Sequence, residues 1–595
     1  MAKIQTGTAE SIYKIEKWLG VNENPDGDTA LKMGEAAEMR NFRITADGHL
    51  QKRPGYKTII EVGEAAQGLW SGRVNGDMYT VAASGGNIFL LDTEAHSKTQ
   101  IGTCHETNAV HFFGYGNKLY VLDGEEYYSW DGTTFGAVEG YVPLVVTASV
   151  PAGGGTQLEQ VNKLTPKRRV RFSPNGEATV FQLPETELKS IDSVKDITTG
   201  EEVTGWEANI EKGTLTFESA PAENTDSLEV SYTAGADDRA KVVGMRFSET
   251  YNGQTDNRVF LYGDGSNELI YSGIDQNGMP TAEYFPDLNE LRAGEENTPV
   301  TGAIRQFSRL IVFKTDSTYS VSYSSLTLVD GTVTAGFYIV PVNRSIGNQA
   351  AGQVQLIANY PRSLHGGGVY EWRNGSYGLT SDERQAKRIS ERVENTLGSF
   401  DAAKCITFDN EYKQDYYIVH NGTAVIHNYA ENAWFIYTDF PAAAFTMIGN
   451  ELYMLTVNGK FAHISREYMS DDGEAIDAFW RSGSMNFGRE WQRKFVSALF
   501  VNIKPETSAR VTVTARSDRR AGYMEKLVAS SLATLSKANF ARWSFGTNRR
   551  PQVERVKLKV KKFALYELIF QSASANERCT VLAVDIKLRH TGYVK

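Results

Sequence analysis

Cysteine is scarce in this chain of 595 residues, which contains only Cys104, Cys405 and Cys579, far apart from one another. Such spacing excludes a disulfide framework and a cysteine-rich zinc site. It is typical of buried, reduced thiols in a protein that folds in a cytoplasm. No stretch approaches roughly 18 consecutive apolar residues, which excludes a transmembrane helix. The N-terminal stretch lacks the apolar core and cleavage site of a secretory signal, so none is expected.

Known catalytic motifs are also missing. The sequence has no GxSxG, HExxH, Walker or dinucleotide-binding pattern. Its nine histidines are scattered; His105 and His111 could share a strand face, but no third ligand is spaced to complete a metal site. The Asp-Gly and Asn-Gly pairs indicate tight hairpin turns, because the spacing of an EF-hand is absent. We therefore predict that the protein is not an enzyme and binds no metal or cofactor.

Aromatic and turn-forming residues are abundant instead. The chain has 29 Tyr, 28 Phe and 54 Gly, a composition that favours β structure with tight turns. Between residues 57 and 465, short apolar–aromatic runs end at Gly, Asn or Asp and many recur about every 8–12 residues. They repeat weakly with a unit of about 40–50 residues, which predicts an all-β protein with a β-propeller of six or seven blades. An array of sandwiches is the alternative.

Two segments depart from this repeat. Residues 141–236 follow a Pro/Gly-rich joint and contain their own alternating strands, which predicts an inserted β-sandwich. We expect the rest of the body to stay folded when residues 144–234 are removed. From about Ile476, longer strands with period-two alternation predict a C-terminal β-sandwich. The predicted divisions are an N-terminal segment (1–55), the propeller in two parts (56–140 and 237–465), the inserted sandwich (141–236) and a basic C-terminal sandwich (466–595).

Helix is expected at two places. The stretch 381–397 places four apolar residues on one helical stripe. They are Ala386, Ile389, Val393 and Leu397. A second helix is predicted near Tyr523.

Charge is distributed unevenly along the chain. Residues 476–595 contain 23 Lys+Arg and 9 Asp+Glu, a net charge of +14. Residues 1–475 contain 39 Lys+Arg and 63 Asp+Glu, a net charge of −24. An acidic body joined to a basic domain indicates two different surroundings or a self-complementary assembly.

Two basic patches are the candidate interaction sites. A strand near the C-terminus alternates four cations with Val556, Leu558 and Val560, which gives it one basic and one apolar face. The cations are Arg555, Lys557, Lys559 and Lys561. The smaller patch, in the insert, consists of Lys167, Arg168 and Arg169. The alternative is that each patch is an ordinary solvated strand face. For the C-terminal strand, the net charge of the whole domain favours an acidic partner as much as a solvated face. Sequence-specific reading of nucleic acid is not expected, because no aromatic platform interleaves the cations.

The N-terminal motif EMRNFRITADGHLQKRPGY resembles the opening of bacteriophage tail proteins of the nozzle or hub type. The matching positions are Asn41, Phe42, Asp47, Gly48, Lys52, Arg53, Pro54 and Gly55. Later segments continue the resemblance in the same order, among them NRVFLYGDGSNELIYSG, PVNRSIGNQAAG and ENAWFIYTDF, as does the C-terminal domain. The resemblance covers most of the chain except the 141–236 insert.

This resemblance implies a structural protein of the virion tail, assembled in the host cytoplasm. Proteins of this family form a ring, usually of six propeller subunits, below the portal and adaptor, and the ring continues the channel through which the genome leaves. The implied partners are further copies of the chain, the portal or adaptor, other tail proteins, and phage DNA that passes without sequence-specific binding. An acidic propeller facing such a channel repels phosphate instead of binding it. The family supplies no catalytic residues.

Two other functions stay open. One is a glycan-binding or carbohydrate-active propeller, which an aromatic–carboxylate cleft in the structure would favour. The other is a host-binding tail fibre or spike. Such proteins are usually trimeric with fibrous or β-helical repeats, and no such repeat is visible in the sequence.

Overall fold

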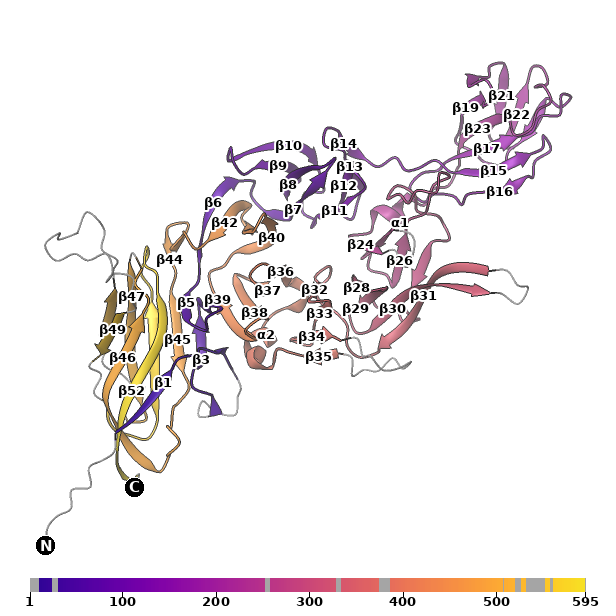
Figure 1. The fold of residues 1–595 in the computed structure, drawn as a ribbon. Helices are drawn as coiled ribbons and strands as arrows, with labels where there is room; N and C mark the ends of the chain where they lie inside the picture. Colours follow the sequence, from indigo (N-terminus) through magenta and orange to yellow (C-terminus); the bar gives the residue numbers. More distant parts are fainter. Residues whose placement is uncertain are drawn as a thin grey trace, which may run out of the picture.

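The computed structural model describes residues 10–23, 30–251, 257–327, 333–373, 386–506, 508–519, 526–530, 552–556 and 560–593. In these residues the chain is almost entirely strand, turn and loop, and its α-helices are two short ones, α1 (Arg239–Val243) and α2 (Glu394–Gly398). The predicted all-β class is confirmed. Figure 1 shows three parts in a row: the sheets of the C-terminal region, an array of small sheets in the middle, and the sheets of the insert at the far end.

Seven sheets form the middle array and are numbered as units one to seven in chain order: six antiparallel sheets of four strands and a last sheet of six strands. Units one to three contain β7 (Ala66–Val74), β8 (Asp77–Ser84), β9 (Asn87–Asp92) and β10 (Ser97–Thr103); β11 (His111–Tyr115), β12 (Lys118–Leu122), β13 (Tyr127–Trp130) and β14 (Phe135–Ala137); and β24 (Phe247–Tyr251), β25 (Arg258–Tyr262), β26 (Glu268–Tyr271) and β27 (Glu290–Arg292). Units four to six contain β28 (Val300–Gln306), β29 (Arg309–Lys314), β30 (Thr318–Thr327) and β31 (Val333–Asn343); β32 (Gln355–Ile357), β33 (Tyr360–His365), β34 (Gly368–Trp372) and β35 (Ala386–Arg388); and β36 (Ile406–Asn410), β37 (Asp415–His420), β38 (Thr423–Asn428) and β39 (Ala433–Tyr437). Unit seven combines β40 (Ala442–Ile448), β41 (Glu451–Thr456) and β42 (Lys460–Ser465) with β6 (Gly55–Glu61), and the short strands β43 (Ser470–Asp471) and β44 (Glu474–Ala475) extend it.

Tight Asn-Gly turns join neighbouring strands of these units and keep the strands short. The Asn75–Gly76 pair joins β7 to β8 with φ angles of 50° and 92°, and the Asn421–Gly422 pair joins β37 to β38 with φ angles of 46° and 73°. Positive φ at two successive residues is the geometry that tight hairpins require and that Asn-Gly supplies. The turn interpretation of these pairs is therefore correct.

The seven units follow one another in space as they do in sequence. The first strand of each unit contacts the first strand of the next, in the order β7, β11, β24, β28, β32, β36 and β40, and β40 in turn contacts β7. Strand β6, which precedes unit one in the chain, pairs antiparallel with β42 as the outer strand of unit seven; Ile60 lies opposite Phe461 and Tyr56 opposite Ile464. The beginning and the end of the array are thus joined through one sheet.

The insert leaves the array between units two and three. In the described residues its main strands pair only with one another, in a six-stranded sheet (β16-β15-β17-β23-β19-β20) and a three-stranded sheet (β18-β22-β21). The strands are β15 (Leu144–Ser149), β16 (Thr156–Gln157), β17 (Lys167–Phe172), β18 (Val180–Gln182), β19 (Ser190–Asp196), β20 (Glu201–Glu202), β21 (Trp206–Asn209), β22 (Thr214–Phe217) and β23 (Leu228–Thr233). Phe172, Phe181, Leu215 and Tyr232 are fully buried between these sheets and give the insert a core of its own.

One segment of the insert, residues 158–166, returns to the array. Asn162 donates hydrogen bonds to the carbonyls of Tyr141 (2.8 Å) and Glu283 (2.9 Å) and accepts one from the Phe285 N–H (2.8 Å). Lys163 is 2% exposed, and its ammonium donates to the Pro286 carbonyl (3.0 Å). Leu164 is buried in a core shared by units two and three. A part of residues 141–236 is therefore built into the body.

The C-terminal region is a sandwich of two sheets that also takes in the N-terminal strands. One sheet has the order β4-β5-β52-β46-β49, with β1 added on β52 and β50 on β46, and the other has the order β2-β3-β45-β51-β47-β48. The strands are β1 (Glu10–Ile15), β2 (Gly20–Val21), β3 (Glu35–Arg40), β4 (Phe42–Ile44), β5 (Leu50–Lys52), β45 (Ala478–Ser482), β46 (Gln492–Ile503), β47 (Ala509–Ser517), β48 (Lys526–Ser530), β49 (Gln552–Val556), β50 (Lys561–Phe563), β51 (Tyr566–Ser572) and β52 (Thr580–Tyr593). The sequence gives no sign of this partnership between strands more than 400 residues apart.

The two predicted helices differ from the structure. Residues 386–388 form β35, which pairs with β34, because tertiary pairing at the edge of unit five overrides the helical spacing of their apolar residues. Residues 381–385 lie outside the described residues; within 386–397 the helical part is a 3₁₀ turn (Glu391–Val393) followed by the start of α2, with Val393 and Leu397 buried. Near Tyr523, which lies outside the described residues, Lys526–Ser530 form strand β48.

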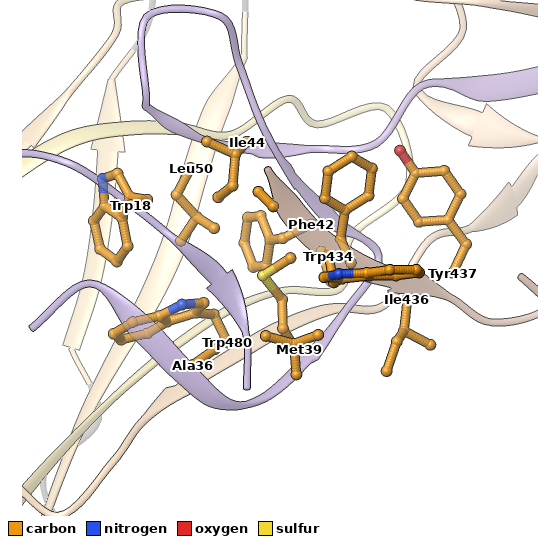
Figure 2. Close-up of a cluster of buried hydrophobic side chains, with 14 of the residues drawn as sticks. Trp18, Ala36, Met39, Phe42, Ile44, Leu50, Trp434, Ile436, Tyr437 and Trp480 are labelled. Carbon is orange, nitrogen blue, oxygen red and sulfur yellow. The ribbon is translucent and has the colours of Figure 1, made fainter. Parts of the chain in front are cut away.

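A shared core fastens the sandwich to the array. Figure 2 shows side chains of the N-terminal segment lying between Trp480 of β45 and the residues of β39 in unit six. The rings of Trp18 and Trp480 meet edge to face with centroids 4.8 Å apart. Phe42 and Leu50 are fully buried in the same core. Large buried aromatic residues contribute the most apolar area, so this core contributes strongly to the attachment of the sandwich to the array.

Candidate functional site

Arg53, from the Lys-Arg-Pro-Gly motif, lies at the centre of this junction and is 3% exposed. Its guanidinium forms two hydrogen bonds with the Asp471 carboxylate, at 2.9 and 2.5 Å. It also donates to the Asn41 side chain at 2.9 Å and to the Thr438 carbonyl at 3.2 Å. Such a paired, fully bonded buried arginine fixes the relative positions of the segments that it joins. Arg53 thus links the N-terminal strands, the end of unit six and β43, which extends unit seven.

Asn41 supports the same link. Its backbone has a φ of 56°, and its side-chain amide donates to the Thr438 hydroxyl and to the Asp477 carbonyl, each at 2.9 Å. Asparagine is among the few residues that adopt this left-handed conformation readily. The sequence motif singled out these positions, but their role as a buried latch depends on Thr438 and Asp471, which lie about 400 residues away in the chain.

The basic strand predicted at residues 555–561 is described only in part, because Lys557 and Lys559 lie outside the described residues. Arg555 of β49 is exposed and lies opposite Phe500 of β46, whereas the neighbouring Val556 is buried. Lys561, at the start of β50, is also exposed, and its ammonium lies 5.8 Å from the centroid of the Phe495 ring. Cations and apolar side chains therefore share this face of the sheet.

The same face continues across β52 and β1. Ile12 of β1 is 61% exposed and lies opposite Lys587. Lys587 and Arg589 both form ion pairs with Glu10, at 2.5 and 2.6 Å. Cations and an exposed apolar residue thus lie together on the outer side of the β1–β52 pair.

The smaller basic patch in the insert is largely neutralised. Arg168 forms an ion pair with Glu185, and Arg169 lies 3.6 Å from a carboxylate oxygen of Glu229. Of its three predicted residues, Lys167 alone has no acidic partner within the described part of the chain, and it is exposed. In Figure 1 the two basic patches lie in opposite end parts of the molecule.

A polar cleft of about 600 Å³ lies where units six and seven meet the β4–β5 hairpin. Its walls come from the turn between β36 and β37, the turn between β40 and β41, and the end of β42. Tyr412, Asp47 and Glu451 are among the residues that line it. The sequence did not indicate this cleft, because its residues are neighbours only in the folded chain.

Two half-buried titratable groups lie on the first strands of units two and three. Burial lowers the pKa of His111 on β11 to about 4, and its ring lies 2.9 Å from the Ser248 hydroxyl of β24. Burial raises the pKa of Glu249, the next residue of β24, to about 7, although hydrogen bonds from the backbone and the charge of Arg305 oppose the shift. His111 is therefore neutral at neutral pH, whereas Glu249 is about half ionised there and becomes protonated as the pH falls below about 7.

We expect Glu249→Gln to stabilise the protein more at pH 8 than at pH 5. The raised pKa means that, between about pH 4.5 and 7, the folded state holds a proton that the unfolded state has lost, so stability falls as pH rises through this window. The full effect corresponds to at most about 3 kcal/mol. Melting temperatures of both proteins between pH 5 and 8 test this; a difference that does not change with pH contradicts it.

The described residues contain no group of three or more His, Cys, Asp and Glu side chains placed to hold a metal ion. Cys104, Cys405 and Cys579 are free thiols, and burial raises the pKa of each to about 12, so none is a thiolate at neutral pH. Within the part of the chain that the structure describes, no helix has the length and apolar character needed to span a membrane.

Comparisons with known proteins give no family. No protein-family model matches the chain, and no curated protein does. Among solved structures, a chain of the mitotic checkpoint complex is 10% identical and covers 71% of this chain and 93% of its own, with a TM-score of 0.32. The AfRom2 CNH domain is 7% identical and covers 68% and 95%, with a TM-score of 0.32. The designed Ika8 protein is 10% identical and covers 69% and 99%, with a TM-score of 0.31. Similarities this low support no inference about function.

Proposed function

We propose that the seven units form one closed, seven-bladed β-propeller. The contact of β40 with β7 and the pairing of β6 with β42 support closure, because they join the last unit to the first. A closed ring of blades leaves only short strand edges exposed and gives a rigid scaffold. The insert and the C-terminal sandwich are attached to this scaffold at different places.

We propose further that the chain is a structural subunit of a bacteriophage tail. Copies of it, six by family resemblance, form a ring that extends the DNA channel below the portal or adaptor in the virion tail and takes part in genome retention and ejection. The observation that carries this proposal is the buried latch: Asn41, Phe42 and Arg53, which carry the resemblance, also fasten the sandwich to the array. A ring around DNA needs a rigid scaffold, and the latch joins the sandwich of each subunit to its array.

Charge supports an assembly of copies. The basic C-terminal region and the acidic remainder attract each other between subunits, provided that the basic face meets acidic residues of a neighbour. DNA is not held by the acidic body, because like charges repel. The protein needs no catalytic group for this role.

We expect that changing Lys557, Lys559 and Lys561 to Glu weakens assembly without unfolding the chain. The buried Val556 and the half-buried Val560 are untouched, so the sandwich core is preserved. The weakening is largest at low salt, where surface charges are least screened, and a loss of at least about tenfold in the assembly constant is expected there. Mass photometry and negative-stain microscopy of the purified protein at low and high ionic strength measure it.

The matched control carries the same charge change in the insert. Lys189, Lys195 and Lys212 are exposed, and their change to Glu leaves assembly at the level of the original protein if the C-terminal strand is the docking face. A wild-type protein that remains a monomer at every concentration contradicts the ring. Equal assembly of both variants and the original protein contradicts the role of the basic strand.

A further inference from the structure

The cleft between units six and seven and the β4–β5 hairpin has the size of a ligand site. Its volume of about 600 Å³ lies within the range of roughly 300–1,000 Å³ that small-molecule sites occupy. It is walled by segments from three separate regions of the chain, and buried residues of the junction core lie beside it. The cleft therefore exists only where these segments meet in the folded chain.

Polar groups in the floor are already bonded to the protein. Arg43 forms an ion pair with the buried Asp415 at 3.1 Å. The Asn428 amide donates to Asp415 at 2.8 Å, and the Gln51 amide donates to the Thr580 hydroxyl at 3.1 Å. Groups that are held in this way do not move when a ligand enters, so the shape of the cleft is set in advance.

Polar groups at the rim are open. Asp47, Gln414 and Asn450 are exposed, and their side chains bond to no other group in the described part of the chain. Tyr412 is 59% exposed, and the Lys413 ammonium lies 4.7 Å from the centroid of its ring, so the stacking surface is the ring face turned away from Lys413. The amides of Gln414 and Asn450 can donate hydrogen bonds to hydroxyl groups and accept them, and the Asp47 carboxylate can accept them. An exposed ring supplies an apolar surface on which a sugar face can stack.

The charge of the cleft is balanced. Its cationic lining residues are Arg43, Lys413 and Arg466, and its anionic ones are Asp47, Glu431 and Glu451. A site for nucleic acid or an acidic peptide has an excess of cations, which is absent here. A ligand that is uncharged and rich in hydroxyl groups fits this combination best.

We propose that this cleft binds a neutral oligosaccharide, with Tyr412 as the stacking surface and Asp47, Gln414 and Asn450 as partners for hydroxyl groups. The proposal is independent of the ring proposed above, since it concerns one subunit. It assigns binding and no chemistry to the cleft.

Maltohexaose, cellohexaose and chitohexaose are the neutral probes, and hexagalacturonate is an anionic probe of the same length. Binding to the purified full chain is measured by saturation-transfer NMR with titration. We expect at least one neutral hexasaccharide to bind and Tyr412→Ala to weaken it about five- to tenfold, as the loss of one aromatic contact predicts. Tyr593→Ala is the matched control, because Tyr593 is 74% exposed on β52, away from the cleft, and its removal leaves binding unchanged.

Each other outcome overturns the proposal. The proposal is wrong if none of the three neutral probes binds to the protein, or if hexagalacturonate is the one probe that binds. Equal binding by the original protein and Tyr412→Ala places the sugar elsewhere. Because Tyr412 is in an exposed turn, its variant keeps the fold, which the melting temperature verifies, and the mass of the assembly reports separately on the ring.

Discussion

Replacing Arg53 with methionine is expected to lower the free energy of unfolding by about 3–5 kcal/mol, because it leaves the buried carboxylate of Asp471 without its partner. Asp471 is 7% exposed, so bulk solvent restores only a part of the lost hydrogen bonds. Urea unfolding followed by tryptophan fluorescence measures the change, since Trp18, Trp434 and Trp480 lie in the adjoining core.

A second variant distinguishes the effect of the unpaired Asp471 carboxylate from the effect of the other lost hydrogen bonds. Arg53→Met combined with Asp471→Leu removes both charges, and we expect it to be more stable than Arg53→Met alone, since no unpaired carboxylate remains buried. A loss below about 1 kcal/mol in the single variant contradicts the latch. A double variant no more stable than the single one shows that the bonds to Asn41 and Thr438 carry the effect instead.

Removal of the insert is expected to destabilise the body or to leave it stable, depending on whether residues 158–166 are removed with it. Deletion of residues 144–234 also removes the segment 158–166, so Leu164 leaves a cavity and the Phe285 N–H loses its partner. These losses amount to about 5 kcal/mol or more, a large share of the stability of a typical domain. The structure therefore changes the expectation, drawn from the sequence, that this deletion leaves the body folded.

A trimmed variant keeps the returning segment. It lacks residues 145–157 and 167–233 and has a short glycine linker at each cut. Both cuts join neighbours: the Glu159 N–H bonds to the Leu144 carbonyl at 3.2 Å, and the Ala234 N–H bonds to the Pro166 carbonyl at 2.9 Å. We expect this variant to unfold cooperatively, with a body about as stable as that of the full chain. Stabilities of the two deletion variants that agree within about 1 kcal/mol contradict the role of residues 158–166.

Local features of this protein follow from the sequence alone. Aromatic runs that end at Asn-Gly or Asp-Gly specify short antiparallel strands, since turn geometry and side-chain alternation act over a few residues. The same locality explains why Arg555 and Val556 have the exposures that their alternation predicts. The uneven distribution of charge between residues 1–475 and 476–595 is likewise a property of the sequence.

Tertiary structure alone decided which distant segments meet. Residues 386–388 have helical spacing of apolar residues but pair with β34 as a strand. The hydrogen bonds gained at the sheet edge outweigh the weak helix propensity. The joining of β6 to β42, the place of β1–β5 in the C-terminal sandwich and the polar cleft beside Tyr412 all depend on contacts across hundreds of residues. No local pattern encodes such contacts, since they depend on how apolar surfaces from the whole chain are buried together.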